Sequence, residues 1–546
     1  MSTPDPVAEM KGVLAAADVA VGEVEPRSFP GENWLIAYVP ESALTAAQSL
    51  AGSIERTLNE KFPDETASYV VTFRPQRVAI EEEEKPTDGS RLARKEITQL
   101  IQLLEARSRT SDALPSLSYV EDPRASLAAV AASRHHLIYG RRGVGKTALL
   151  LEAKRIAERE GHVAAWINAQ TLRQLDAATA FAEIADAVLE ALLRQAGSSQ
   201  SAVFARLSKA KSSFEKLLEK RPVSDIAIAN AMAKLNLALR SILKPGIIRL
   251  NLFIDDFYLL PVSVQPQLLD YTSSMLRDTD GWIKVASIER LTRPFEPSTK
   301  IGLEIPHDAS RIDLDLTLEN PGAAQDFLES VLSKYTSTAG IKQLSSIAKP
   351  EALGRLTIAS GGVPRDYLNL FASSIVAARG RNKAREIGRE DVARAASESS
   401  QSKKRDLEQD VSSDISGALL IALERLSNTV KSEGYAYFRV DMADKDRPGY
   451  ELLAQLVDMR FTHLIQATLS DQRKAGKKYE AYMLALSEFA DVRLRRSLEI
   501  LDLESGSWVA RLTGTRGSKQ RLVGTQLRDK LRRAPLVSVD DLIADN

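Results

Sequence analysis

The chain has 546 residues, of which 44% are hydrophobic and 27% are charged, and this profile predicts a globular protein of roughly three or four domains. Its 73 basic and 73 acidic side chains balance, so overall charge does not indicate a nucleic-acid partner, and any basic surface must be local. The absence of cysteine excludes disulfides, thiol catalysis and cysteine-ligated zinc, and the five histidines lack the spacing of metal ligands. Neither a signal peptide nor an apolar run of about 20 residues is evident, so we expect a cytoplasmic protein with no membrane partner.

The first 76 residues predict a small α+β domain. Two runs typical of strands, ENWLIAYVP and ASYVVTFRP, flank TAAQSLAGSIERTLNEKF, which has the apolar spacing of a helix. Residues 77–114 predict an acidic linker and a helix. The segment EEEEKPTDGS at 81–90 is interpreted as a solvated spacer, and RKEITQLIQLLEARSR has helical periodicity.

The segment GRRGVGKT at 140–147 fits the pattern G-x-x-x-x-G-K-[ST] at every fixed position. HHLIY before it predicts a strand, and ALLLEAKRIAERE after it predicts an amphipathic helix. Glycines allow successive backbone N–H groups to surround phosphates, and the helix N-terminus adds its positive dipole. Lys146 could then reach the β- and γ-phosphates, and Thr147 could ligate Mg²⁺. A glycine turn with a chance lysine is the alternative. The predicted nucleotide site comprises Gly140, Gly143, Gly145, Lys146, Thr147 and Ala148.

A second motif, GIIRLNLFIDDFYLL at 246–260, supports this site. Its apolar, β-branched run is typical of a strand buried on both faces of a parallel sheet, and the strand ends in Asp255 and Asp256. Carboxylates at that edge of the sheet would lie beside the phosphate loop. We assign Asp255 to the Mg²⁺ shell, through water, and Asp256 to orienting or deprotonating the attacking water. The alternative is a strand cap that faces solvent.

Residues 115–316 alternate strands with helices, which predicts a doubly wound parallel α/β sheet. A helical excursion at 177–243 separates the second and third strands, and helices at 317–398 follow the sheet. The predicted strands lie near 136–139, 163–168, 248–254, 282–287 and 311–316.

The polar segment 399–414 predicts a linker, and residues 415–490 predict a winged helix. The order is a helix at 416–431, a turn at YAYFRV, the helix PGYELLAQLVDM, and a hairpin with the basic turn DQRKAGKK. Cations on such a turn could contact the phosphates of duplex DNA, and a solvated hairpin tip is the alternative. Residues 491–546 form a basic C-terminal extension. The candidate DNA contacts are Arg473, Lys474, Lys477 and Lys478.

These motifs resemble those of AAA+ ATPases, particularly the origin-recognition-complex-like group, over roughly residues 115–490. The likeness includes YVEDPRASLAAV, where the family contacts adenine. It includes WIKVASIER, where Ser287 matches the polar sensor-1 residue, and ASGGVPRDYLNL, where Arg365 matches the sensor-2 arginine. The resemblance implies a P-loop AAA+ core, a helical lid and a C-terminal winged helix, with ATP and Mg²⁺ as ligands and Arg365 reaching the γ-phosphate. Alternatively, Arg365 is merely exposed at a helix start, after Pro364.

The chain departs from the group in its second acid, which is usually Glu and here is Asp256, one methylene shorter. This departure bears on the speed of hydrolysis and not on binding. The paired aspartates also resemble those of STAND NTPases. An arginine finger for a neighbouring subunit could be Arg290, Arg293 or Arg311, and a surface salt bridge is the alternative for each.

The sequence therefore predicts an ATP-binding, ATP-hydrolysing AAA+ switch whose winged helix reads nucleotide state out on duplex DNA or a partner protein, within a homo-oligomer or hetero-complex. One alternative is a STAND-type switch in signalling or antiphage (antiviral) defence. Another is a scaffold that binds ATP with negligible turnover.

Overall fold

The computed structural model describes most of the chain and separates into two compact units, Met1–Thr87 and Asp88–Asn546, which are treated individually. Within the described ranges no helix is long and apolar enough to cross a membrane. The acidic spacer at 81–90 lies outside the described residues. The described residues are 5–17, 19–29, 32–63, 67–75, 91–106, 119–196, 202–244, 248–381, 384–409, 414–472, 474–489, 498–512 and 519–543.

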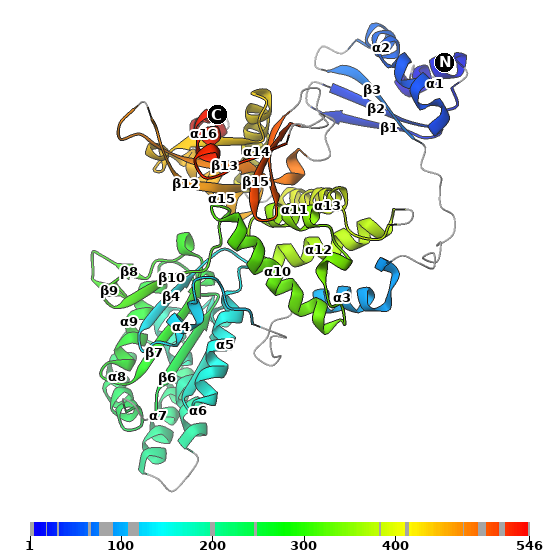
Figure 1. The fold of residues 1–546 in the computed structure, drawn as a ribbon. Helices are drawn as coiled ribbons and strands as arrows, with labels where there is room; N and C mark the ends of the chain where they lie inside the picture. The colour runs from blue at the N-terminus through cyan, green and yellow to red at the C-terminus, as the bar shows by residue number, and fades with distance from the viewer. Residues whose placement is uncertain are drawn as a thin grey trace. The chain divides into compact units, whose positions relative to one another are not determined.

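The first unit is a three-stranded sheet with two helices, so its α+β elements agree with the sequence (Figure 1). β1 and β2 are antiparallel, whereas β2 and β3 are parallel and are joined by the crossover helix α2. Leu35, Ala37 and Val39 of β2, which point to one face of the sheet, pack in the core of this unit. The elements are α1 (Pro6–Ala16), β1 (Val24–Phe29), β2 (Glu32–Val39), α2 (Leu44–Lys61) and β3 (Ser68–Pro75).

The second unit contains the predicted five-stranded parallel sheet, in the order β10-β4-β7-β6-β5. Every neighbouring pair in it is parallel, which confirms the predicted doubly wound fold. Because β4, β7 and β6 are adjacent and parallel, their carboxyl ends lie side by side at the same edge of the sheet. The strands are β4 (His135–Tyr139), β5 (Val163–Asn168), β6 (Leu250–Asp255), β7 (Gly281–Ser287) and β10 (Ala309–Asp313), and a short hairpin is formed by β8 (Phe295–Glu296) and β9 (Ile301–Gly302).

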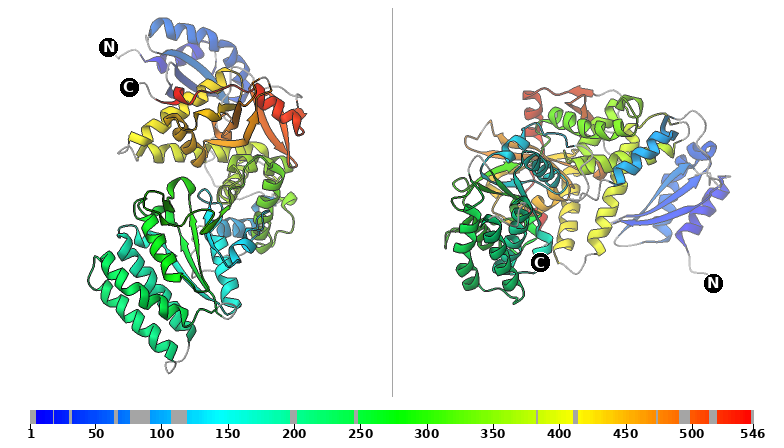
Figure 2. Two further views of the ribbon diagram at one scale, coloured as in Figure 1. Left: turned by 90° about the vertical axis from the view of Figure 1, so that its left-hand side faces the viewer. Right: turned by 90° about the horizontal axis from the view of Figure 1, so that it is seen from below.

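Helices cover both faces of this sheet (Figure 1). Leu252 and Ile254 of β6 pack in the cluster that includes α6 and α9, whereas Phe253 between them packs in the cluster that includes α4 and α5. Helices α6, α7 and α8 lie side by side and form the predicted helical excursion (Figure 2). The helices are α4 (Ser126–Ala131), α5 (Lys146–Arg159), α6 (Ala177–Ala196), α7 (Ala202–Leu218), α8 (Asp225–Arg240) and α9 (Gln265–Leu276).

The helical lid follows the sheet, and α3, which the sequence places beside a linker, packs into it against α10 and α12. Nε of Arg379 on α12 donates to the carbonyl of Leu92, 2.9 Å away, and fixes this attachment. The helices are α3 (Lys95–Ala106), α10 (Pro321–Thr338), α11 (Pro350–Ser360), α12 (Pro364–Arg379) and α13 (Arg389–Gln409).

The predicted linker at 399–414 is wrong as far as Gln409, because α13 continues through it. The segment is rich in Lys, Arg, Glu and Gln, which are good helix formers, so its polarity marks an exposed helix face and not an irregular segment. Its small residue Ser400 is buried, and Lys404 pairs with Glu488 at 2.8 Å. Helix α13 therefore joins the lid to the C-terminal module.

The C-terminal module has the order helix, strand, helix, hairpin, which is compatible with a winged helix. The predicted turn at YAYFRV is wrong, because Tyr437–Asp441 forms strand β11 and pairs with β13. Phe438 stacks on Tyr482 across this pair, with ring centroids 5.6 Å apart, so cross-strand aromatic packing decides the outcome. The elements are α14 (Asp414–Ser432), β11 (Tyr437–Asp441), α15 (Pro448–Asp458), β12 (Thr462–Ser470) and β13 (Lys478–Leu484).

The described part of the basic C-terminal extension is a folded element of the same unit. Its strand β14 packs on α11 so closely that a Cβ at Gly354 would lie 2.3 Å from the carbonyl oxygen of Leu503. The elements are β14 (Glu499–Glu504), β15 (Ser507–Leu512), β16 (Lys519–Arg521) and α16 (Thr525–Arg533).

Candidate nucleotide-binding site

The phosphate loop joins the carboxyl end of β4 to the N-terminus of α5. Gly143 and Gly145 have φ angles of +88° and +107°, a region that residues with a Cβ rarely adopt. Lys146, Thr147 and Ala148 open α5, whose N-terminal N–H groups and dipole favour an anion. The loop therefore has the backbone geometry that a phosphate site requires.

Lys146 is the buried cation of this loop, with 6% of its surface exposed. Its Nζ donates to the carbonyl oxygens of Gly140, at 2.6 Å, and Arg141, at 3.0 Å. Burial lowers the pKa of the Lys146 ammonium, and the charges of three nearby aspartates, led by Asp315, oppose that shift. A desolvated ammonium in this position gains from a phosphate charge.

Thr147 and Asp255 meet across the loop, since the Thr147 hydroxyl donates to Oδ2 of Asp255 at 2.7 Å. Burial raises the pKa of Asp255, and the neighbouring Asp256 carboxylate adds to this effect. One hydroxyl and one carboxylate are hard oxygen donors of the kind that Mg²⁺ takes, alongside water and phosphate oxygens. Among the described residues no cluster of three or more His, Cys, Asp or Glu side chains could hold a metal by itself. The two residues fit a Mg²⁺ site completed by nucleotide and water.

Asp256 directly follows β6 and is half-buried, with a φ angle of +52°. Its backbone N–H donates to Oδ1 of Asp255 at 2.9 Å. The structure thus brings both predicted acids to the phosphate loop, and the assignment of water activation to Asp256 stays a prediction.

Ser287 ends β7 and lies in register with Tyr139, the last residue of β4. Its buried Oγ is 2.5 Å from Oγ1 of Thr292, which in turn donates to the carbonyl of Ile288 at 2.6 Å. Ser287 is therefore the donor to Thr292. It lies between the loop strand and the Asp255 strand, where the sensor-1 resemblance puts it, and contact with nucleotide stays a prediction.

Arg365 lies at the start of α12, directly after Pro364, and its backbone N–H donates to the carbonyl of Gly143 at 3.2 Å. A Cβ at Gly143 would lie 2.8 Å from the Cβ of Arg365, so only glycine permits this approach. The structure thus brings the predicted sensor-2 residue against the phosphate loop.

Sequence reasoning missed the partners of Arg141, a variable position of the loop motif. Its backbone N–H and Nε both donate to Oδ1 of Asp315, at 3.0 and 3.1 Å. Its Nη2 donates to the carbonyl of Gly361 on the lid, 3.1 Å away. Arg141 therefore ties the loop both to the segment after β10 and to the lid.

A second missed contact comes from Arg460, just after α15 of the C-terminal module. Its Nη1 donates to the carbonyl of Arg142 in the phosphate loop at 3.2 Å, and its guanidinium pairs with Asp366 of α12. Both side chains are largely buried. Arg460 thus contacts the loop and the lid together, and no local sequence pattern could have found a partner 318 positions away.

The same module reaches the segment after β7. Arg290 pairs with Asp458 and with Glu451, the latter at 3.2 Å, and both acids lie on α15. Arg293 pairs with Glu296 at 2.7 Å, and Arg311 pairs with Glu289. Each candidate arginine finger thus makes an ion pair within the chain, as the salt-bridge alternative predicts, and a role toward a neighbouring subunit stays a prediction.

His463 on β12 packs against the lid loop next to α12. A Cβ at Gly361 would lie 2.4 Å from its Nδ1. Burial, followed by the charge of Arg141, lowers the pKa of His463 to about 3, so the ring is neutral at physiological pH.

The cations of the β12–β13 turn differ in their surroundings. Lys474 and Lys478 are exposed, whereas Nζ of Lys477 pairs with Asp441 at 2.8 Å. Arg473 lies outside the described residues. Tyr479 and Tyr482 are buried and pack in the strand, as their alternation predicts.

One family model matches the part of the chain that contains the phosphate loop. Residues 124–278 match the family model described as an AAA ATPase domain. Solved structures similar to the chain include the Orc1 protein of Aeropyrum pernix in complex with DNA, at 16% identity and a TM-score of 0.35, covering 72% of this chain and 96% of that one. A Walker-type ATPase of Pyrococcus abyssi has 11% identity and a TM-score of 0.33, covering 68% and 98%. Drosophila ORC bound to DNA has 11% identity and a TM-score of 0.27, covering 64% and 87%. No curated protein matches the chain.

The parallel sheet, the glycine loop and the paired acids define a P-loop nucleotide-binding fold. The matched residues 124–278 include the phosphate loop and both acids, and the predicted resemblance to AAA+ ATPases is confirmed.

Proposed function

We propose that this chain is an ATP-dependent switch, which binds ATP with Mg²⁺, hydrolyses it and transmits nucleotide state through the lid to a DNA-contacting C-terminal module. The observation that carries the proposal is the convergence of three parts on one loop. The carbonyl of Gly143 accepts from Arg365 of the lid, and the neighbouring carbonyl of Arg142 accepts from Arg460 of the C-terminal module. A phosphate that shifts this loop or Arg365 shifts both contacts.

In this proposal the phosphate loop and the α5 N-terminus hold the triphosphate, with Lys146 as the buried charge. Thr147 and Asp255 would hold Mg²⁺, which offsets the negative charge of the phosphates. Asp256 accepts the proton of the attacking water, and Ser287 and Arg365 respond to the γ-phosphate. Contacts that exist only with the γ-phosphate would select one lid position, and hydrolysis would release it.

Exposed cations support duplex DNA as the partner of the module. Lys474 lies on the hairpin turn, and Lys478 is the first residue of β13. Lys519 and Arg521 lie on β16, where Lys519 pairs with Glu504, and all four residues are exposed. Cations on exposed elements bind the DNA backbone with little regard for sequence.

The test is an ATP hydrolysis assay on the full chain with and without duplex DNA. The proposal predicts turnover that depends on Asp256 and changes when DNA is added. Turnover that is absent under both conditions would favour an ATP-binding scaffold, and turnover that ignores DNA would favour a switch with a protein partner.

A further inference from the structure

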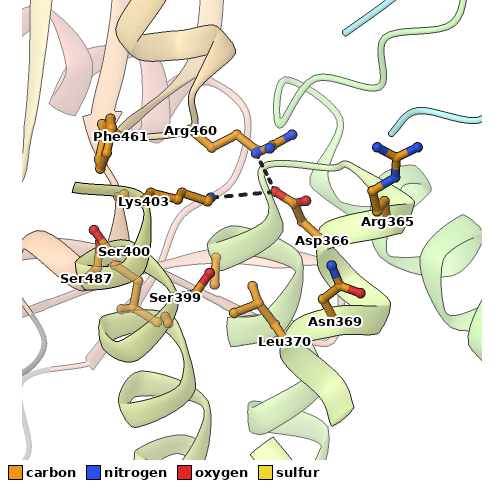
Figure 3. Close-up of a pocket in the computed structure, with 14 residues that line it drawn as sticks. Arg365, Asp366, Asn369, Leu370, Ser399, Ser400, Lys403, Arg460, Phe461 and Ser487 are labelled. Atoms are coloured by element: carbon orange, nitrogen blue, oxygen red, sulfur yellow. Dashed lines mark ion pairs between the residues drawn. The ribbon is translucent and has the colours of Figure 1, made fainter. Parts of the chain in front are cut away.

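A cavity of about 250 Å³ lies behind the sensor-2 helix, between the lid and the C-terminal module (Figure 3). Its walls come from α11, α12 and α13, including the part of α13 that the sequence predicts as a linker, and from the segments that flank β12 and β13. Figure 3 shows Lys403 and Arg460 directed toward Asp366, whereas Arg365 extends away from Lys403. The cavity therefore adjoins the phosphate loop through Arg365 and Arg460, which contact loop carbonyls, whereas Lys403 lies away from Arg365.

The lining of this cavity carries more positive than negative charge. Asp366 is its single acid, and it serves two cations: it pairs with Arg460, and its Oδ2 is 3.9 Å from Nζ of Lys403. Burial lowers the pKa of both Lys403 and Arg460, and Asp366 only partly opposes that shift. Excess positive charge in a partly desolvated cavity is unfavourable until an anion joins it.

Polar groups suited to an anion surround these cations. The side chains of Ser399, Ser487 and Asn369 line the same space, together with apolar residues that include Phe461 and Leu370. The Lys403 side chain is 35% exposed, so part of the side chain faces solvent although its ammonium is largely desolvated. The volume lies below the roughly 300–1,000 Å³ of sites for drug-sized ligands, which favours a compact ligand.

We propose that this cavity binds a small phosphate-bearing anion, the size of pyrophosphate or a sugar phosphate, with Lys403 and Arg460 as its charged donors. The ligand would be a second one, distinct from the nucleotide of the phosphate loop. Because Lys403 belongs to α13 and Arg460 to the C-terminal module, an anion between them fastens the module to the lid. The inference does not depend on ATP hydrolysis or on DNA binding.

The experiment is a calorimetric titration of inorganic pyrophosphate into the full chain carrying Lys146→Ala, which removes the main charge of the phosphate loop. We expect saturable binding that Lys403→Gln weakens about tenfold, the loss expected for one charge-assisted contact. Lys404→Gln is the matched control, because the adjacent Lys404 pairs with Glu488 and does not line the cavity. It should leave the affinity unchanged.

A second arrangement keeps the wild-type loop and saturates it with a non-hydrolysable ATP analogue and Mg²⁺ before pyrophosphate is added. It covers the case in which Lys146→Ala does not fold. Failure to bind pyrophosphate in a folded chain would overturn the proposal. Equal affinities of the Lys403→Gln and Lys404→Gln chains would also overturn it. Neither result would bear on ATP binding, which depends on the phosphate loop.

Discussion

The two sides of the nucleotide site are built in different ways. One side is a loop of eight consecutive residues, 140–147, with Asp255 beside it, and its geometry rests on glycine backbone angles and one buried lysine. The other side consists of Arg365, Asp366 and Arg460, held by one backbone hydrogen bond and by side-chain contacts between segments far apart in the chain. We therefore expect changes on the loop side to remove ATP binding or hydrolysis. Changes on the lid side should instead remove the effect of bound ATP on DNA affinity.

The largest effect should come from Asp256→Asn. The amide keeps hydrogen bonding but cannot accept a proton, so turnover should fall by about 10²–10⁴-fold, the usual contribution of a general base. ATP affinity should stay within a fewfold of the parent. Single-turnover hydrolysis and a binding titration measure the two quantities. If Asp255→Asn removes turnover with ATP still bound while Asp256→Asn does not, the roles of the two acids are reversed.

The next effect is on binding itself. Lys146→Ala removes the buried charge nearest the phosphates, which should cost about 1.5–3 kcal/mol, or roughly ten- to a hundredfold in affinity for ATP with Mg²⁺. Lys154→Ala is the control, because that lysine lies two turns further along the same helix, where it pairs with Glu158 at 3.0 Å. Calorimetry that finds the same affinity in the two variants would remove the phosphate-loop assignment.

On the lid side the expected effect is smaller, and it concerns the coupling between ATP binding and DNA binding. Arg460→Gln and Asp366→Asn should leave ATP affinity within about tenfold but reduce the effect of ATP on DNA affinity. In a double-mutant cycle the two changes should couple by about 0.5–3 kcal/mol, since each removes the same ion pair. Additive effects would show that the pair does not carry the communication.

The smallest effects are expected on DNA affinity, from changes to the cations of the β12–β13 hairpin turn. These cations should differ in their contributions. Lys474→Ala and Lys478→Ala should each lower the slope of log affinity against log salt by about 0.9, as the loss of one phosphate contact does. Lys477→Ala should change it less, because that lysine already pairs with Asp441. The fourth candidate DNA contact, Arg473, is neutralised in the same series. Lys216→Ala, an exposed site on α7, is the control. Equal slopes for all variants would exclude this turn as a DNA contact.

What the sequence could predict follows the same division. The loop, the β6 strand and the pair of acids are local patterns, so their placement follows from the chain order and a parallel sheet. The end of α13, from residue 399, looks like a linker in the sequence because its face is polar, and β11 looks like a turn because a short strand is fixed by its partner β13. Arg460 and Asp366 lie 94 positions apart (460 − 366), with no shared motif. Only the fold brings them together.

The account is tested most directly by titrating ATP with Mg²⁺ into the full chain in the presence and absence of saturating duplex DNA. Linkage requires that a switch that senses ATP and binds DNA show the coupling in both directions, at about 1–3 kcal/mol, or roughly 5–150-fold in affinity. We expect DNA to change the ATP affinity of the parent by at least about fivefold and to leave that of Arg460→Gln nearly unchanged. Identical ATP affinities of the parent with and without bound DNA would contradict the account.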